Sequence, residues 1–487
     1  MQKSDIDIEL LFGKDRGQED ENLSKYFIKT GQYRSIFNGN KELVLGRKGS
    51  GKSSIFSHLC LELPNNGTIP VPISPTGEDF SLIENKLSSY KDMDFHDDFK
   101  YSLAWYELIL TEIAFSVISE KHGSLIKGTD EVLYKYVKSN EKVKGDFVSR
   151  FANAVLKAFS GGKVNLGAAE LNIDFSSFSE MDAPDNNKIK KALYNVIIEN
   201  EFFVMVDNLD EPWKNTLQMN CWLRGLILAA RRLKRDFKNL KIVIFLRDDI
   251  YNEIVKGSDI FDSRSELLFL NWKDENFFSL RQLLAARIAN YYRETYPKSV
   301  DEFDELLKRI YPLELVLHNK HRYTTQYIGH RTFYKPRDFL QFFRSSIEVS
   351  YSEVLPIPQG AIIKAEAEYS SWKISFVEGE YSKTYERIKE CVNTFVGATN
   401  DWTMPYKDVL THLTSIDDSA KIFNKAESYV LTPEQAADFL FSCGFFRKVK
   451  RGYQSTTFLT YLDEPNPRIK GSNLDIHPAF RTSLAKR

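Results

Sequence analysis

The sequence predicts an α/β fold with a parallel sheet, followed by a helical lid and a C-terminal winged-helix domain. Three observations support this prediction. Short apolar runs of the buried-strand type alternate with helical segments up to about residue 275, as in parallel sheets. Beyond that residue the apolar spacing becomes purely helical. Near the C-terminus, short helices precede two strand-like segments joined by a turn, which is the order of elements in a winged helix.

The first apolar run, Leu43–Leu45, leads into Gly46-x-x-x-x-Gly51-Lys52-Ser53, which has the spacing of a phosphate-binding P-loop. Glycines permit backbone conformations that let the loop amides converge on an anion, and the following helix adds its positive end. Lys52 is expected to contact the β- and γ-phosphates, and Ser53 to bind Mg²⁺. The alternative is a glycine-rich turn before a helix, but the strand before the loop and the apolar helix after it argue against that.

The loop therefore predicts a site for ATP and Mg²⁺ in a P-loop NTPase core. The residues expected to hold the nucleotide at this loop are Gly46, Arg47, Lys48, Gly49, Ser50, Gly51, Lys52, Ser53 and Ser54.

A second apolar run, Phe202–Val206, ends in Asp207. A carboxylate at the end of such a strand is typical of the Walker B motif and would hold Mg²⁺ with Ser53. A further carboxylate must orient the attacking water. The candidates are Glu211, which we favour, and Asp210; both would act with Lys52 in catalysis. The alternative is that the two acids complement the start of a helix near Pro212.

Arg247 follows a third apolar run, Ile242–Leu246. A polar residue at the carboxyl end of a parallel strand faces the ligand crevice, so Arg247 is a candidate sensor of the γ-phosphate. The alternative is an ion pair with Asp248 or Asp249, which follow it directly.

Two more segments carry candidate residues. Arg264 precedes the strand-like segment Leu267–Leu270; it could reach the nucleotide of a neighbouring subunit, or be a solvated loop residue. In Lys335-Pro336-Arg337-Asp338, Pro336 could lie against the adenine and Arg337 could reach the γ-phosphate. The alternative is a proline in the first turn of a helix.

The chain is expected to form three domains. They are a P-loop core over residues 1–275 with a helical insertion at about 76–200, a helical lid over 276–370, and a helical linker with a winged-helix-like domain over 371–487. In the core, two prolines in Ile69–Ile73 favour a strand at the edge of the sheet. Alternating residues between about 164 and 175 indicate a hairpin inside the insertion.

The composition is that of a globular protein of the reducing cytoplasm. The 487 residues carry a net charge of −1, so any nucleic-acid contact must come from a local patch. The four cysteines are far apart, which argues against a zinc site or a disulfide framework. The N-terminus does not resemble a signal peptide, and no apolar run approaches the ~18 residues of a membrane span.

The C-terminal ribbon is basic. Arg447, Lys448, Lys450 and Arg451 lie on its first strand, and such charges could neutralise DNA phosphates. The same kind of domain also serves as a protein-docking module, and the sequence leaves both roles open.

These motifs together resemble an orphan bacterial P-loop ATPase family related to the KAP and STAND groups of AAA+-like ATPases. The resemblance covers residues from about 20 to 487. It rests on Tyr26-Phe27, the P-loop, and the segments 206–211, 245–251, 335–338 and 475–480.

The resemblance implies an ATP-hydrolysing switch that forms a homo-oligomer, acts on a protein effector and, in many relatives, takes part in defence against phage. Two residues depart from the pattern. Asn208 stands where the plain Walker B motif has its catalytic glutamate, so hydrolysis could be slow. Lys335 stands where an arginine is common, which leaves Arg337 as the sensor. The alternative function is a nucleotide-gated DNA-binding regulator with little hydrolysis.

Overall fold

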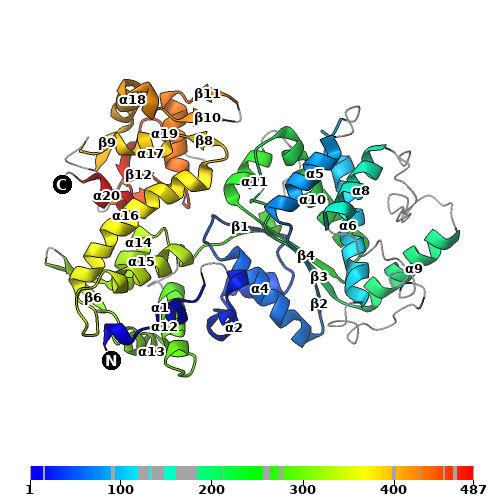
Figure 1. Cartoon of the computed structure of the whole chain (residues 1–487), viewed down its shortest axis with the longest axis horizontal. Coiled ribbons are helices and arrows are strands. Elements are labelled where there is room, and N and C mark those ends of the chain that lie inside the picture. Colours follow the sequence, from blue (N-terminus) through cyan, green and yellow to red (C-terminus); the bar gives the residue numbers. More distant parts are fainter. Residues whose placement is uncertain are drawn as a thin grey trace. The chain divides into compact units, whose positions relative to one another are not determined.

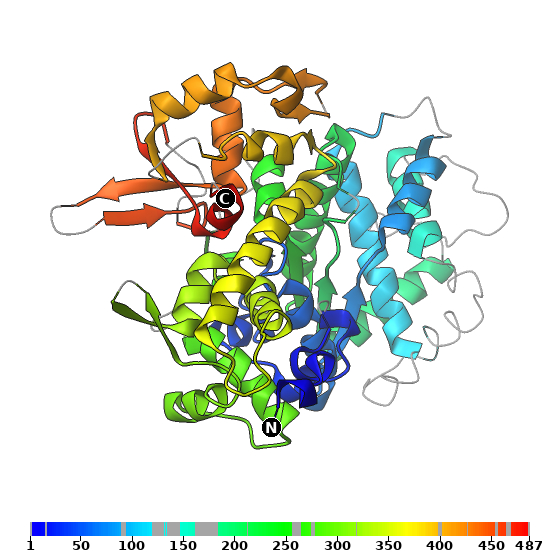
Figure 2. The same cartoon turned by 60° about the vertical axis from the view of Figure 1, so that its left-hand side comes forward.

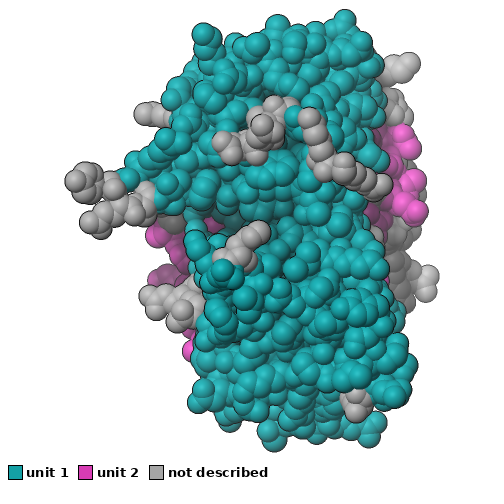
Figure 3. All heavy atoms as spheres, turned by 90° about the vertical axis from the view of Figure 1, so that its left-hand side faces the viewer, with its two compact units in different colours: residues 1–14, 271–487 teal, residues 15–270 magenta. Residues whose placement is uncertain are grey.

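The computed structural model describes most of the chain in two compact units. The described residues are 2–14, 17–88, 94–118, 131, 133, 147–160, 184–211, 213–255, 264–273, 278–317, 319–397, 402–425, 427–452, 456–463 and 469–485. Unit 2 is residues 15–270, and unit 1 combines residues 1–14 with 271–487 (Figure 3). No helix in these described ranges combines the length and apolarity needed to cross a bilayer.

Unit 2 is built on a parallel sheet, which confirms the predicted α/β fold. The described strands are β1 (Leu43–Leu45), β2 (Ile69–Ile73), β3 (Phe202–Val206), β4 (Leu240–Leu246) and β5 (Leu267–Phe269), in the order β2-β3-β4-β1-β5. All pairs are parallel. Among the strands in the described residues, β2, the strand with two prolines, pairs only with β3 and so lies at the edge, as predicted.

Helices cover both faces of this sheet (Figure 1). Alternate strand residues point to opposite faces. Val44, Met205 and Phe245 pack with α3 (Gly31–Phe37) and α4 (Lys52–Glu62). The strand residues between them pack on the other face with the helices that follow β2, β3 and β4. These are α5 (Gly77–Ser88), α6 (Asp98–Ile118), α8 (Phe147–Ser160), α9 (Pro184–Glu199), α10 (Leu217–Asp236) and α11 (Asp248–Ile254).

The insertion between β2 and β3 is helical where the structure describes it, with α5, α6, α8 and α9. The hairpin predicted near residues 164–175 lies outside the described residues. Ahead of β1, the short helix α2 (Leu23–Tyr26) and the 3₁₀ turn Gly17–Glu19 precede α3.

The first part of unit 1 is a helical region of five helices. They are α12 (Phe278–Tyr291), α13 (Val300–Leu307), α14 (Thr324–Arg331), α15 (Pro336–Glu348) and α16 (Gln359–Tyr381). The prediction that this region is purely helical was wrong. Strands β6 (Glu314–Leu317) and β7 (Lys320–Tyr323) form an antiparallel hairpin. Asn319, at φ 61°, lies in its turn, a conformation that Asn adopts more readily than most residues.

The N-terminal segment, which the sequence analysis assigns to the P-loop core, packs with unit 1. Helix α1 (Ile8–Phe12) buries Leu11 and Phe12. Arg287 of α12 donates to the carbonyl of Phe12, and Arg344 of α15 donates to the carbonyl of Gly13 at 3.1 Å. These contacts join the first 14 residues to helices that come almost 300 residues later.

The rest of unit 1 holds the winged-helix domain. After β8 (Tyr385–Glu386) and α17 (Ile388–Asn393) come β9 (Thr403–Pro405), α18 (Tyr406–Ser415), β10 (Phe423–Asn424), β11 (Tyr429–Val430), α19 (Pro433–Ser442), β12 (Phe446–Arg451), β13 (Thr456–Leu459), β14 (Asn473–Ile476) and α20 (Pro478–Leu484). The main sheet has the order β13-β12-β14-β9. Strands β12 and β13 form the expected ribbon, which projects from the domain in Figure 2.

Candidate nucleotide-binding site

The P-loop connects β1 to α4 with a backbone that only glycine adopts easily. Gly49 and Gly51 have φ of 85° and 99°, in the left-handed region. A Cβ on Gly46 would lie 2.5 Å from Oγ of Ser50, so the loop closes too tightly for a side chain there. The amide of Gly46 donates to the carbonyl of Leu246 at 3.2 Å. The loop is thereby tied to the end of β4, the central strand of the sheet.

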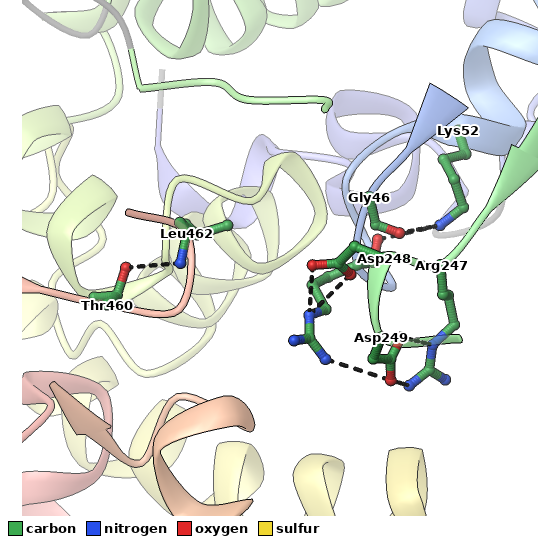
Figure 4. Close-up of polar contacts among 8 residues, drawn as sticks. Gly46, Lys52, Arg247, Asp248, Asp249, Thr460 and Leu462 are labelled. Carbon is green, nitrogen blue, oxygen red and sulfur yellow. Dashed lines mark hydrogen bonds and ion pairs between the residues drawn. The ribbon is translucent and has the colours of Figure 1, made fainter. Parts of the chain in front are cut away.

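Lys52 is buried inside this loop. Its Nζ donates to the carbonyl of Gly46 at 2.6 Å and to that of Arg47 at 3.3 Å (Figure 4). Only 7% of the residue is exposed. A buried ammonium held by two carbonyl oxygens can exchange them for phosphate oxygens, which are stronger acceptors because they are charged.

Asp207 lies next to the P-loop, where it interacts with Ser53 and Lys52. It follows β3 and is 1% exposed. Burial raises the pKa of its carboxyl from 3.8 to about 6, helped by the charge of Asp210; the amide of Asn208, the charge of Lys52 and a hydrogen bond with Ser53 act in the opposite direction. The predicted convergence of the two motifs is thus present, although β4 lies between β1 and β3.

The Asp207 carboxylate and the Ser53 hydroxyl make a suitable oxygen pair for Mg²⁺, a hard cation that binds protein oxygens and keeps several waters. A metal ion would also remove the cost of holding the buried carboxylate ionised. The residues present therefore fit this cation.

A network of four charged side chains lies beside the loop. Asp249 receives Nε and Nη2 of Arg247 at 3.0 and 2.5 Å, and Nη1 of Arg47 at 3.3 Å. Nε of Arg47 also lies 2.9 Å from Asp248. Figure 4 shows this network at the end of β4. The ion pair that we considered as the alternative role of Arg247 is therefore present, and γ-phosphate sensing by Arg247 stays a prediction.

Asp249 is ionised in this network. Burial raises the pKa of its carboxyl, but the charges of Arg247 and Arg47 outweigh burial and hold the pKa well below its usual value. The Asp249 carboxylate thus links Arg47, the second residue of the P-loop, to Arg247, the residue after β4.

The segment after Asp207 is held in an unusual conformation. Asn208 has φ 62° and its Nδ2 donates to Oγ of Ser74 at 2.7 Å. Ser74 follows β2, so the ends of β2 and β3 are joined here. Asp210 is half-buried and its charge acts on Asp207, whereas Glu211 is exposed.

The helix-start interpretation of Asp210 and Glu211 was wrong. The following helix, α10, begins at Leu217 with Thr216 as its N-cap, so the two acids lie in the loop before it. Their position favours Asp210 over Glu211 as the carboxylate closer to Asp207 and Ser53, the two residues that would hold Mg²⁺. The choice between them as the water-orienting group stays open.

Two further residues form part of the site and did not stand out in the sequence. Ser74 is described above. Gly17 packs against the start of α4, where a Cβ would lie 2.4 Å from Oγ of Ser54. The polar residue after β2 was a detectable signal, because ligands bind at the carboxyl ends of parallel strands. The position of Gly17, like the contact of Asp249 with Arg47, depends on tertiary structure.

The remaining candidate residues from the sequence lie on other elements. Pro336 and Arg337 begin α15 in unit 1, where the guanidinium of Arg337 lies 5.6 Å from the ring centre of Phe376. Their contact with a nucleotide stays a prediction. Arg264 begins the 3₁₀ turn before β5, and its side chain lies outside the described residues.

Comparison with known proteins adds three findings. The family described as FunZ-associated C-terminal helical domain matches residues 279–378, which span α12 to most of α16. A protein of Escherichia coli strain K12, named for transposon gamma-delta and its mass of 80.3 kDa, is 22% identical over 496 residues. The structure of the Aeropyrum pernix ORC1 protein in complex with DNA aligns with a TM-score of 0.37 and 10% identity, over 98% of this chain and 95% of that chain.

The alignment with the Escherichia coli protein covers 97% of this chain and 66% of that protein. The chain is therefore similar, along nearly its whole length, to just under two thirds of a longer protein.

Proposed function

We propose that the chain binds ATP with Mg²⁺ at the P-loop and hydrolyses it as a conformational switch. The observation that supports this proposal is that Asp207, after β3, interacts with two residues of the P-loop, through a hydrogen bond with Ser53 and through the charge of Lys52. Two oxygen ligands and one ammonium, next to a glycine-rich loop at a helix start, provide the groups that a triphosphate–metal pair requires.

Each residue has a distinct role in the proposed reaction. Lys52 exchanges its carbonyl partners for phosphate oxygens, and the loop amides donate to the same phosphates. Asp207 and Ser53 hold Mg²⁺, which neutralises charge on the phosphates when bound. Asp210 or Glu211 orients the attacking water. Arg247 changes partner from Asp249 to the γ-phosphate, which would report that phosphate to α11.

The wider role follows from the resemblance to KAP and STAND ATPases. We infer a homo-oligomeric regulator in the cytoplasm that acts on a protein effector, with phage defence as one setting. The relative named for a transposon is compatible with a gene carried on a mobile element. In this view Arg337 senses the γ-phosphate from the helical region, Pro336 lies against the adenine, and Arg264 serves a neighbouring subunit.

The test is nucleotide binding by the Lys52→Ala variant, measured by calorimetry with Mg-ATP and Mg-ADP. Charge-assisted hydrogen bonds contribute about 1.5–3 kcal/mol each, so losing those to two phosphates should weaken ATP binding by about 100-fold or more. Lys238→Ala, which removes an exposed lysine of the same unit, is the matched control. Unchanged ATP affinity in Lys52→Ala would refute the proposal.

A second candidate function is nucleotide-gated DNA binding through the β12–β13 ribbon. Of its four basic residues, Arg447 is already paired with Asp475 at 2.5 Å and stacked 3.8 Å from the ring centre of Phe458. Lys450 and Arg451 are exposed and remain available to phosphates. The helix before the ribbon, α19, exposes acidic rather than basic residues, which argues against its entry into the major groove.

If the chain binds DNA in this way, only the β12–β13 ribbon contacts the phosphate backbone of the duplex. Replacing Lys450 and Arg451 by Ala should weaken duplex binding and reduce its logarithmic salt slope by about 2, since each lost phosphate contact removes ~0.9. The control replaces two exposed lysines of the same unit, Lys389 and Lys407. Equal duplex affinity of the ribbon variant and the wild type would reject DNA binding at this ribbon.

A further inference from the structure

The turn between α14 and α15 has a strained backbone. Phe333 and Tyr334 are consecutive and have φ of 53° and 55°. Residues with a side chain adopt this left-handed region at a cost in free energy, and two in succession add their costs. Such a turn persists only where the surrounding structure holds it.

The winged-helix domain holds this turn through an aromatic clamp, which we define as Phe333, Gly444, Tyr461 and His477. The ring of Phe333 stacks on that of His477, with 3.8 Å between centroids and 16° between planes. The ring of Tyr461 lies 5.8 Å away. A Cβ on Gly444 would lie 2.9 Å from the Phe333 ring, so a glycine is needed for this approach.

His477 is fixed independently of Phe333. Its amide donates to the carbonyl of Phe445 at 2.9 Å, and its Nδ1 accepts from the amide of Ala479 at 3.2 Å as the N-cap of α20. The residue is 3% exposed. The clamp therefore joins a rigid corner of the winged-helix sheet to the strained turn.

On its other side the turn sets the start of α15. The amide of Tyr334 donates to the carbonyl of Gly329 at 3.1 Å, and that of Lys335 to Thr332 at 2.9 Å. Lys335 is the N-cap, and Arg337 lies in the first turn of the helix. The ring that contacts the winged-helix domain, Phe333, and the guanidinium predicted to sense the γ-phosphate, Arg337, are thus four positions apart in the chain.

Asp338 anchors the same helical turn. Its Oδ2 receives Nζ of Lys373 at 2.5 Å and the hydroxyl of Tyr369 at 3.1 Å. Because Asp338 is completely buried, α15 is held in place from this residue onward. A change in the turn at Phe333 is therefore expected to be confined to the residues between the turn and this anchor, which include Arg337.

We propose that Phe333 and His477 are positioning residues, through which the winged-helix domain sets the placement of Arg337 and hence the discrimination between ATP and ADP. This inference rests on the proposed function, because it takes Arg337 as the sensor. It assigns the winged-helix domain an indirect effect on nucleotide state, which acts through the turn that the stack of Phe333 on His477 holds.

The test uses paired substitutions in the full chain. His477→Asn keeps a side-chain acceptor for the α20 cap but removes the ring, whereas His477→Phe keeps a ring and removes the acceptor. Phe333→Leu removes the ring from the other side of the stack. A positioning role predicts that His477→Asn and Phe333→Leu behave alike and that His477→Phe stays close to the wild type.

Two measurements report the result. Hydrogen exchange of the Tyr334 and Lys335 amides should become about tenfold faster in the two ring-loss variants, since the turn opens more often. The ratio of ADP to ATP dissociation constants should fall at least about fivefold, towards that of Arg337→Ala, within the usual range of coupling between sites. Thermal unfolding of each variant checks that the fold is intact.

The possible outcomes distinguish a failure of this positioning role from a failure of the proposed ATP-binding function. If Arg337→Ala abolishes discrimination but His477→Asn and Phe333→Leu keep it, the positioning role is wrong and ATP sensing stands. If Arg337→Ala itself keeps discrimination while Lys52→Ala loses binding, Arg337 is no sensor and the inference is overturned. ATP binding by Lys52→Ala overturns the function itself.

Should the ring-loss variants not fold, Tyr334→Gly gives a second measurement. Glycine accepts the left-handed conformation without the side-chain cost, and the Phe333 stack is left in place. Tyr334→Ala is the matched control, because both variants lose the hydroxyl contact with His330 and the ring contact with Lys273. Tyr334→Gly should melt at a higher temperature than Tyr334→Ala, and an equal or lower melting temperature would contradict the strained turn on which the inference depends.

Discussion

Replacing Asp207 by Asn should stabilise the protein while it abolishes turnover. The pKa of this carboxyl rises from 3.8 to about 6, with burial as the largest cause. One pKa unit corresponds to ~1.4 kcal/mol, so the ionised group costs the folded chain about 3 kcal/mol. Asn has nearly the same shape and no charge. We therefore expect a gain of about 2–3 kcal/mol in the free energy of unfolding at about pH 8.

The pH dependence of this gain has a definite sign. The folded state has the higher pKa, so between 3.8 and about 6 it binds more protons than the unfolded state. The contribution of Asp207 to stability therefore falls as pH rises through that window and is fully unfavourable above it. The advantage of Asp207→Asn over the wild type should shrink to about half at pH ~5.

The assay is urea and thermal unfolding without magnesium or nucleotide, at both pH values. A gain of this size in a unit of 256 residues corresponds to a rise of about 5 °C or more. Asp94→Asn, at a carboxylate whose side chain is 80% exposed, should change stability by less than about 0.5 kcal/mol. If Asp207→Asn is no more stable than the wild type at pH ~8, or its gain does not shrink on acidification, the argument for a buried, strained carboxylate is refuted.

Two further predictions concern catalysis and acid sensitivity. Glu211→Gln and Asp210→Asn should both bind ATP, but only the variant at the water-orienting carboxylate should lose turnover, by about 100-fold or more in kcat. If both variants hydrolyse ATP as fast as the wild type, neither residue orients the water. Burial and four neighbouring cations hold the pKa of His477 well below 6.5, so the unfolded chain gains a proton first on acidification, and stability should fall as pH drops below about 6.5. Thermal unfolding of His477→Phe should show a shallower decline, and an equally steep one would contradict the assignment. The cations are Arg331 of α14, Lys373 of α16, Arg447 of β12 and Arg481 of α20.

The P-loop and the Walker B strand could be predicted because each is a local motif. The spacing from Gly46 to Ser53 dictates a loop and a helix start, and the apolar run before Asp207 dictates a buried strand. Prolines at two positions of β2 remove ladder donors, and this alone indicated its place at the edge. Local chemistry determines these features, so one sequence is sufficient to find them.

Other features depend on contacts between residues far apart in the chain. The ion pair of Arg247 with Asp249 is local and could be considered from the sequence, but the contact of Asp249 with Arg47, about 200 positions earlier in the chain, has no local signal. The hairpin of β6 and β7 was missed because its residues lie between helices and are mostly exposed, so no buried alternation marks it. The strained turn at Phe333 was missed because neither residue is a glycine or an asparagine.

The placement of the first 14 residues bears on how the chain is made and divided. Leu11 and Phe12 are synthesised before unit 2, yet the helices that contact their segment emerge from the ribosome only after the whole of unit 2. During synthesis the apolar side chains of this short helix therefore stay exposed until α12 and α15 have been made, and chaperones can bind them. A fragment meant to contain unit 2 alone should therefore begin after residue 14, and a fragment beginning at residue 271 should recover its full stability only when the N-terminal peptide is added back.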